Sequence, residues 1–138
     1  MGTRAVITFK DKNFGRTEKY SVYQHYDGSP DSVAESLVKA QTKAWGWPRF
    51  EASDFAAAYI AANKEGAGNL YLTSGPQRHF DLEFAYEVTF DKNQSSLIVE
   101  TFVVNTDEND KQTTMTISKC SLSELLDQKG RDWYRYAA

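Results

Sequence analysis

The chain has 138 residues, of which 41% are hydrophobic and 14% aromatic, and its formal net charge is −3 at pH 7. This composition is too apolar for a disordered chain and suits one packed domain over residues 1–138. The acidic balance disfavours direct binding of nucleic acid, and no apolar run approaches the roughly 20 residues that cross a bilayer, so we expect no membrane association. A single cysteine, Cys120, excludes an internal disulfide and favours a cytoplasmic protein.

The first half of the sequence predicts two strands followed by two helices. Alternating side chains predict strands over 3–10 and 19–26, which a turn containing Asn and Gly joins. Ser29 is expected to cap a helix that begins at Pro30, because a proline at the first helical position has no N–H to leave unpaired. Ser53 is expected to cap a second helix, which the glycine-rich run 65–69 ends.

The second half predicts four strands, over 69–73, 79–90, 96–104 and 113–119, and a final helix. The stretch 79–90 alternates throughout, with an apolar and a polar face. Ser121 and Glu124 form the pattern of a capping box at the start of the final helix. Short turns between the strands and helices grouped in sequence predict an α+β fold. We expect two layers, with a mainly antiparallel sheet in the order β-β-α-α-β-β-β-β-α and the helices on one face.

Two H-x-D triplets, at 25–27 and 79–81, contain both histidines of the chain. Because residues i and i+2 of a strand point the same way, each triplet is expected to place an imidazole and a carboxylate on one face. Neighbouring triplets would suit an acid–base pair, a ligand pocket or a metal ion, but the spacing matches no zinc signature, and we predict no metal or cofactor. The alternative is structural, since Asp27-Gly28 is also typical of a turn. The candidate ligand-binding residues are Arg4, His25, Asp27, Gly28, Arg78, His79 and Asp81, with His25 and His79 as candidate catalytic bases.

The middle of the chain is strongly acidic. Residues 51–110 contain eleven Asp or Glu and three Lys or Arg. Such asymmetry can steer a basic partner, whereas the alternative is a solvated acidic face of the sheet. The candidate partner-binding residues are Glu83, Glu87, Asp91, Glu100, Asp107, Glu108 and Asp110.

Several short pieces occur together within residues 3–90: T-R-A at 3–5, H-Y-D-G at 25–28, A-S-D-F-A-A-A at 52–58, Y-L-T at 71–73 and H-F-D at 79–81. The combination resembles a family of small proteins of phages, prophages and bacterial accessory regions that has no assigned activity. Ser29 stands where many relatives have tyrosine. The resemblance implies a small cytosolic protein encoded by a mobile element, and proteins of that kind often block host defence.

Three functions follow as hypotheses. The first is a non-enzymatic accessory protein that inhibits a host defence system in the cytoplasm of the bacterial host, in the manner of anti-CRISPR proteins, by binding a protein effector through an acidic sheet face. The second is a protein that sequesters a nucleotide signal in the H-x-D pocket and that could form a homo-oligomer. The third is a small phosphodiesterase or glycosidase in the same pocket, with His25 or His79 as the base.

Overall fold

The computed structural model describes residues 2–13 and 15–136. Six strands and three helices account for most of them, with two short 3-10 helices. The strands are β1 (Ala5–Asn13), β2 (Arg16–Gln24), β3 (Leu70–Thr73), β4 (Phe84–Asp91), β5 (Ser96–Thr106) and β6 (Gln112–Ser121). The α-helices are α1 (Pro30–Gln41), α2 (Ala52–Asn63) and α3 (Leu122–Asp127), and the 3-10 helices are η1 (Pro76–Arg78) and η2 (Trp133–Tyr136).

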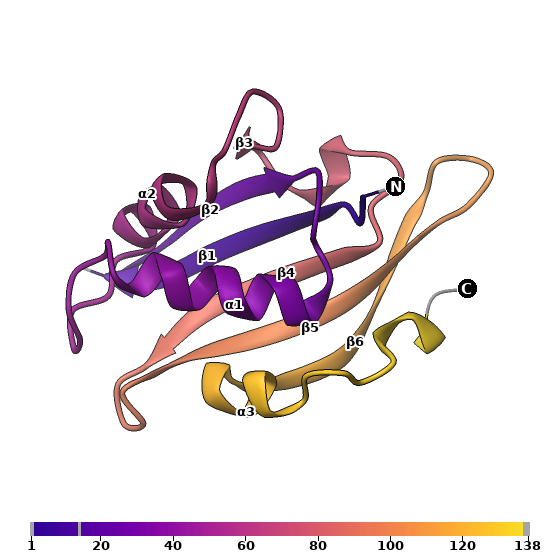
Figure 1. Cartoon of the computed structure of the whole chain (residues 1–138). Helices are drawn as coiled ribbons and strands as arrows, with labels where there is room; N and C mark the ends of the chain where they lie inside the picture. The colour runs from indigo at the N-terminus through magenta and orange to yellow at the C-terminus, as the bar shows by residue number, and fades with distance from the viewer. Residues whose placement is uncertain (1, 14, 137–138) are drawn as a thin grey trace.

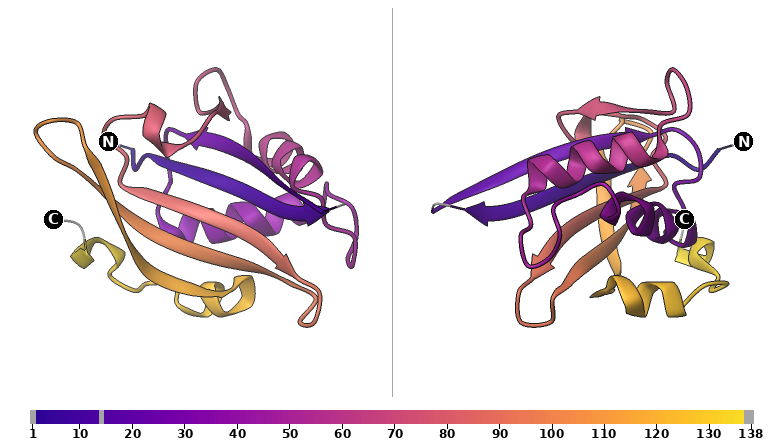
Figure 2. Two further views of the ribbon diagram at one scale, coloured as in Figure 1. Left: turned by 180° about the vertical axis from the view of Figure 1, so that it is seen from behind. Right: turned by 60° about the vertical axis from the view of Figure 1, so that its left-hand side comes forward.

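The strands form one sheet in the order β3-β2-β1-β4-β5-β6. β1 and β4 run parallel, and every other pair of neighbours is antiparallel. The helices α1, α2 and α3 cover one face of the sheet (Figures 1 and 2). This confirms the predicted α+β fold with a mainly antiparallel sheet. No helix in the described ranges is long and apolar enough to cross a membrane.

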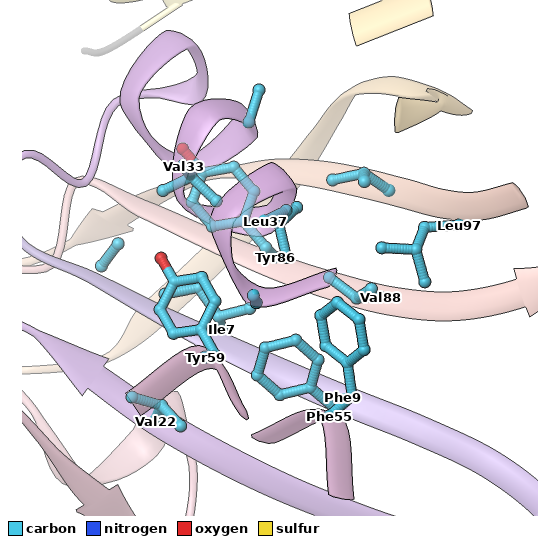
Figure 3. Packing of buried hydrophobic residues seen from close by; sticks show 14 of the residues in the cluster. Ile7, Phe9, Val22, Val33, Leu37, Phe55, Tyr59, Tyr86, Val88 and Leu97 are labelled. Atoms are coloured by element: carbon cyan, nitrogen blue, oxygen red, sulfur yellow. The ribbon is translucent and has the colours of Figure 1, made fainter. Parts of the chain in front are cut away.

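The main core lies between the helices and the sheet. Figure 3 shows Ile7 and Phe9 of β1 beside Phe55 and Tyr59 of α2. The ring of Phe9 lies 5.5 Å from that of Phe55 and 5.6 Å from that of Tyr59, and all four side chains are almost fully buried. The odd positions of β1 therefore define the covered face, and the even positions point to the face without helices.

Two tyrosine hydroxyls in this core fix the start of α1. Tyr59 donates a hydrogen bond to Gln24 Oε1 at 2.6 Å, and Tyr86 donates to the carbonyl of Gly28 at 2.6 Å. Burial raises the pKa of both phenols above the usual value, so both stay protonated donors. The amide of Gln24 donates in turn to the carbonyls of Tyr26 and Asp27.

The predicted helix starts are confirmed at two of three places. Ser29 occupies the N-cap position of α1 with Pro30 first in the helix, although its hydroxyl makes no capping hydrogen bond, and Ser121 and Glu124 form the capping box of α3. The predicted cap at Ser53 is wrong, because α2 begins at Ala52 with Glu51 as its N-cap.

Several predicted strand limits are also wrong, and two of these errors affect the H-x-D triplets. β2 ends at Gln24, and β4 begins at Phe84, so residues 25–27 and 79–83 lie outside the strands. Asp27 and Asp81 have φ values of 57° and 61°, a left-handed conformation that ends the alternation of a strand. The argument from i and i+2 therefore does not hold for either triplet.

Candidate ligand-binding site

The face of the sheet opposite the helices carries a crossing segment of the chain. Residues 74–83, here called the crossover segment, connect β3 to β4 across β2 and β1. Leu82 anchors the segment in a small second core with Val6, Tyr23, Ala85 and Val104. This core places the crossover segment directly on the face of the sheet that carries no helices, here called the open face.

Polar contacts also hold the crossover segment. The side-chain amide of Gln112, at the start of β6, donates to the carbonyls of Pro76 at 3.0 Å and His79 at 2.6 Å. The backbone N–H of Glu83 donates to the carbonyl of Arg4 at 3.0 Å. Strands far apart in the sheet thus fix the position of His79.

Four rings gather where the crossover segment meets the sheet, and we call Tyr23, His25, Tyr71 and His79 the tyrosine–histidine cluster. The ring of His79 stacks on that of Tyr23, with centroids 4.4 Å apart and planes at 16°. Tyr71 of β3 lies opposite Tyr23 in the sheet, with ring centroids 4.8 Å apart. The Tyr23 hydroxyl lies 2.8 Å from Nδ1 of His25. The structure therefore brings both predicted histidines into contact with Tyr23.

The surroundings of His79 disfavour the charged form of its imidazole. Its Nε2 lies 2.7 Å from the hydroxyl of Thr73. Burial, with a smaller contribution from the positive charge of Arg78, lowers the pKa of His79 below its usual value near 6.5. Burial likewise raises the pKa of Tyr23. For both His79 and Tyr23, burial disfavours the charged form of the ring.

Arg4 and Asp81 lie near this cluster as an ion pair. The distance between Arg4 Nη1 and Asp81 Oδ2 is 3.3 Å, and the Asp81 side chain is 78% exposed. No ion pair joins a carboxylate to His25 or His79 within residues 2–13 and 15–136. Neither histidine therefore forms an ion pair with the aspartate of its own triplet.

Asp27 and Gly28 form the turn into α1 and do not face the cluster. The N–H of Gly28 donates to the carbonyl of Thr3 at 2.9 Å, and its own carbonyl accepts from Tyr86. Asp27 lines a separate surface hollow with Gln24 and residues of α1 and α2. The structure thus agrees with the alternative that these two residues serve the turn.

A hollow opens beside the cluster at the edge of the sheet. Its volume is about 430 Å³, and Arg78 lies exposed at its rim. A second groove, of about 570 Å³, runs between the crossover segment and the floor of the open face. The smaller hollow is lined by Tyr71, Leu72, Thr73, Ser74, Arg78 and His79.

In the described part of the chain, no group of three or more His, Cys, Asp or Glu side chains is placed to hold a metal ion. The polar atoms of the cluster are hydroxyls and ring nitrogens, and the guanidinium of Arg78 lies at the rim of the adjoining hollow. Such groups suit an organic ligand with aromatic and anionic parts better than a cation.

The seven candidate acidic residues do not form one patch. Glu87 pairs with Lys10 at 3.0 Å, and Glu100 accepts a hydrogen bond from Thr116. Asp91 and Asp107 accept backbone N–H groups in the turns before and after β5, which lie at opposite ends of the sheet. Glu83 lies exposed in the crossover segment, and Glu108 and Asp110 lie exposed in the turn after β5.

Sequence reasoning missed Tyr23, Tyr71 and Thr73. Tyr23 precedes His25 by two residues and could have been found from the alternation of β2. Tyr71 and Thr73 could not, because only the register of β2 with β3 places them opposite Tyr23 and Ser21. A comparison of the chain with protein-family models, with curated proteins and with solved structures finds no match.

Proposed function

We propose that the chain binds and sequesters a nucleotide-type ligand at the tyrosine–histidine cluster. The observation that carries this proposal is the stack of His79 on Tyr23, beside Tyr71 and a hollow of about 430 Å³ with Arg78 at its rim. The ring of Tyr71, which is 44% exposed and lines the hollow, suits a nucleobase, because every base can stack on an aromatic ring. A guanidinium suits phosphate, because its fork of donors matches two oxygens.

Binding is favoured over hydrolysis by the surroundings of the imidazoles. A histidine that acts as a general base is usually oriented by a third group, most often a carboxylate. Nε2 of His79 faces Thr73, Nδ1 of His25 faces Tyr23, and Asp81 pairs with Arg4. These contacts support a protein that holds its ligand without cleaving it.

The resemblance to phage and prophage proteins suggests the setting. In the cytoplasm of a bacterial host, removal of a signal nucleotide from solution would silence the defence that depends on it. The proposed protein thus inhibits host defence by sequestration, and its role needs no second substrate or cofactor.

A second candidate function is the binding of a defence effector, and one observation favours it. The hairpin of β5 and β6 reaches beyond the rest of the sheet (Figure 1) and ends in exposed Asp107, Glu108 and Asp110. An acidic projection of this kind suits a basic nucleic-acid channel. Capture of an effector that weakens with rising salt and with Glu108→Lys would support this function, and salt-insensitive capture would contradict it.

Thermal unfolding with a panel of linear and cyclic mono- and dinucleotides tests the first proposal. A ligand at 100 times its Kd should add about 2.7 kcal/mol to the free energy of unfolding. Arg78→Ala and Tyr71→Ala should abolish the effect, and Arg16→Ala, an exposed arginine outside the hollow, should preserve it. Release of the intact nucleotide when the protein is heated indicates sequestration, and a cleaved product indicates a hydrolase. No shift with any nucleotide would contradict the proposal.

A further inference from the structure

β1 and β4 separate at their carboxyl ends. Their parallel pairing stops at Phe9 and Val88, while β1 continues to Asn13 against β2 and β4 continues to Asp91 against β5. Figure 2 shows the two hairpins diverging. After β1 the chain turns into β2, toward the β3 edge of the sheet, and after β4 it turns into β5, toward the β6 edge. The connections therefore change direction between β1 and β4. In open sheets with parallel strands, ligands bind in the crevice that such a change creates.

The space between the separating strands is a hollow of about 430 Å³, here called the β1–β4 crevice. Its lining includes Lys10, Lys12 and Lys92. Lys10 pairs with Glu87, but neither Lys12 nor Lys92 makes an ion pair with a described residue, and both are exposed. The crevice therefore has an excess of positive charge, although the whole chain has a net charge of −3.

One wall of the β1–β4 crevice is aromatic. Phe50 and Phe90 stack with centroids 5.7 Å apart and planes at 15°, and Trp47 supports Phe90 from 4.7 Å. These rings belong to the edge of the main core, so the wall is rigid. A rigid apolar wall beside ammonium groups suits a ligand that has a carbon skeleton as well as a charge.

A buried acceptor without a partner lies in the same lining. Asp11 accepts the backbone N–H of Ala52 with Oδ2, whereas Oδ1 is buried and has no hydrogen-bond partner among the described residues. A buried carboxylate oxygen is rarely left unpaired in a native protein. Because this oxygen has almost no accessible surface, a ligand in the crevice would not contact it directly.

We infer that the β1–β4 crevice is a second binding site, for a small phosphate ester with a carbon skeleton. Lys12 and Lys92 would bind the phosphate, and the phenylalanines would cover the carbon skeleton. The site lies at the carboxyl end of β1, whereas the tyrosine–histidine cluster lies beside Val6 at its start. It is therefore independent of the proposed nucleotide site.

Titration calorimetry with inorganic phosphate and ribose 5-phosphate tests this inference. Ribose 5-phosphate should bind saturably and more tightly than phosphate. The double variant Lys12→Glu/Lys92→Glu should weaken this binding roughly tenfold or more, which corresponds to about 1.4 kcal/mol. The control Lys111→Glu/Lys119→Glu reverses two exposed lysines outside the crevice and should keep the affinity, as should Arg78→Ala.

Three results would each overturn the inference. The first is no saturable binding of ribose 5-phosphate, and the second is equal affinity for ribose 5-phosphate and phosphate. The third is a loss of affinity in Lys111→Glu/Lys119→Glu as large as that in Lys12→Glu/Lys92→Glu. Circular dichroism of both double variants establishes that they are folded. The exposure of all four lysines makes folding of the variants the expected result.

Discussion

Gly28 lies where the chain passes from β2 into α1, and its α-carbon faces the start of β1. A Cβ atom at this position would lie 2.7 Å from the Cβ of Ala5 and 2.7 Å from the carbonyl oxygen of Thr3. Both neighbours belong to fixed parts of the core edge and cannot give way at low cost. The close approach, and not a left-handed φ, is the reason for glycine here.

Gly28→Ala should therefore lower the free energy of unfolding by about 1–3 kcal/mol, the usual effect of overpacking. Urea denaturation measures it. The control is Gly66→Ala, where a Cβ would have no heavy atom within 4 Å, and its effect should stay within about 1 kcal/mol. Equal effects at the two glycines would contradict this account of the turn.

His79 should make stability depend on pH. Burial and Arg78 lower the pKa of His79 in the folded protein, whereas the unfolded chain titrates near the usual 6.5. Below about pH 6.5 the unfolded chain takes up a proton that the folded protein resists, so the free energy of unfolding should fall as the pH falls. The contribution is fully present above that pH.

Chemical denaturation from neutral to mildly acidic pH measures the effect, and His79→Gln should make the loss of stability smaller. Arg78→Ala should raise the pKa of His79 partway to its usual value in an NMR titration. A His79→Gln variant with the same pH dependence as the unaltered protein would show that the fold does not lower the pKa of this imidazole.

Single residues also show why the site was only partly predictable. Both aspartates of the H-x-D triplets adopt positive φ, which no alternation pattern reveals. The histidines were found because they are rare and polar. Their common partner, Tyr23, is an ordinary strand residue by sequence, and only the crossover segment gives it a role.

At the scale of elements, α3 is short and depends on its start. The Ser121 hydroxyl accepts the N–H of Glu124 at 3.2 Å, and the Glu124 carboxylate accepts the N–H of Ser121 at 3.1 Å. These bonds hold the pKa of Glu124 below its usual value. Leu122 and Leu125 then enter the main core.

Ser121→Ala should destabilise the protein by about 1 kcal/mol, because one N–H at the start of α3 loses its acceptor. Thermal or urea unfolding measures the change, and the pKa of Glu124 should rise in parallel. Ser123→Ala, at an exposed position of the same helix, should have little effect. A larger loss from Ser123→Ala would contradict the capping account.

The stretch 79–90 shows what a periodic pattern does and does not predict. Alternation correctly separates the faces of β4, with Phe84, Tyr86 and Val88 in the main core. It does not show where a neighbouring strand is available for pairing. β4 starts at Phe84 because this residue lies opposite Ala5, the first residue of β1.

At the scale of the whole molecule, the sequence predicted the fold class but not the order of strands. The parallel contact of β1 with β4 joins residues about 80 positions apart and depends on the core between sheet and helices, which no local pattern encodes. Both proposed sites depend on this contact. One lies where the crossover segment reaches β4, and the other lies where β1 and β4 separate.

Surface charge should contribute little to stability. Each of the four ion pairs among the described residues leaves both side chains at least 28% exposed. Raising the NaCl concentration from about 0.05 M to about 0.5 M should therefore change the free energy of unfolding by less than about 1 kcal/mol. Urea denaturation at the two salt concentrations measures this, and a larger loss would show that the pairs act as a network.

The central claim is that the open face of the sheet binds a nucleotide at the tyrosine–histidine cluster. The most direct test is a map of backbone amide shifts by two-dimensional NMR during titration with the nucleotide panel. The account predicts saturable shifts at residues 71–79 and at Tyr23 and His25, which Arg78→Ala removes. Shifts confined to α1 and α2, or no saturable shift with any nucleotide, would contradict it.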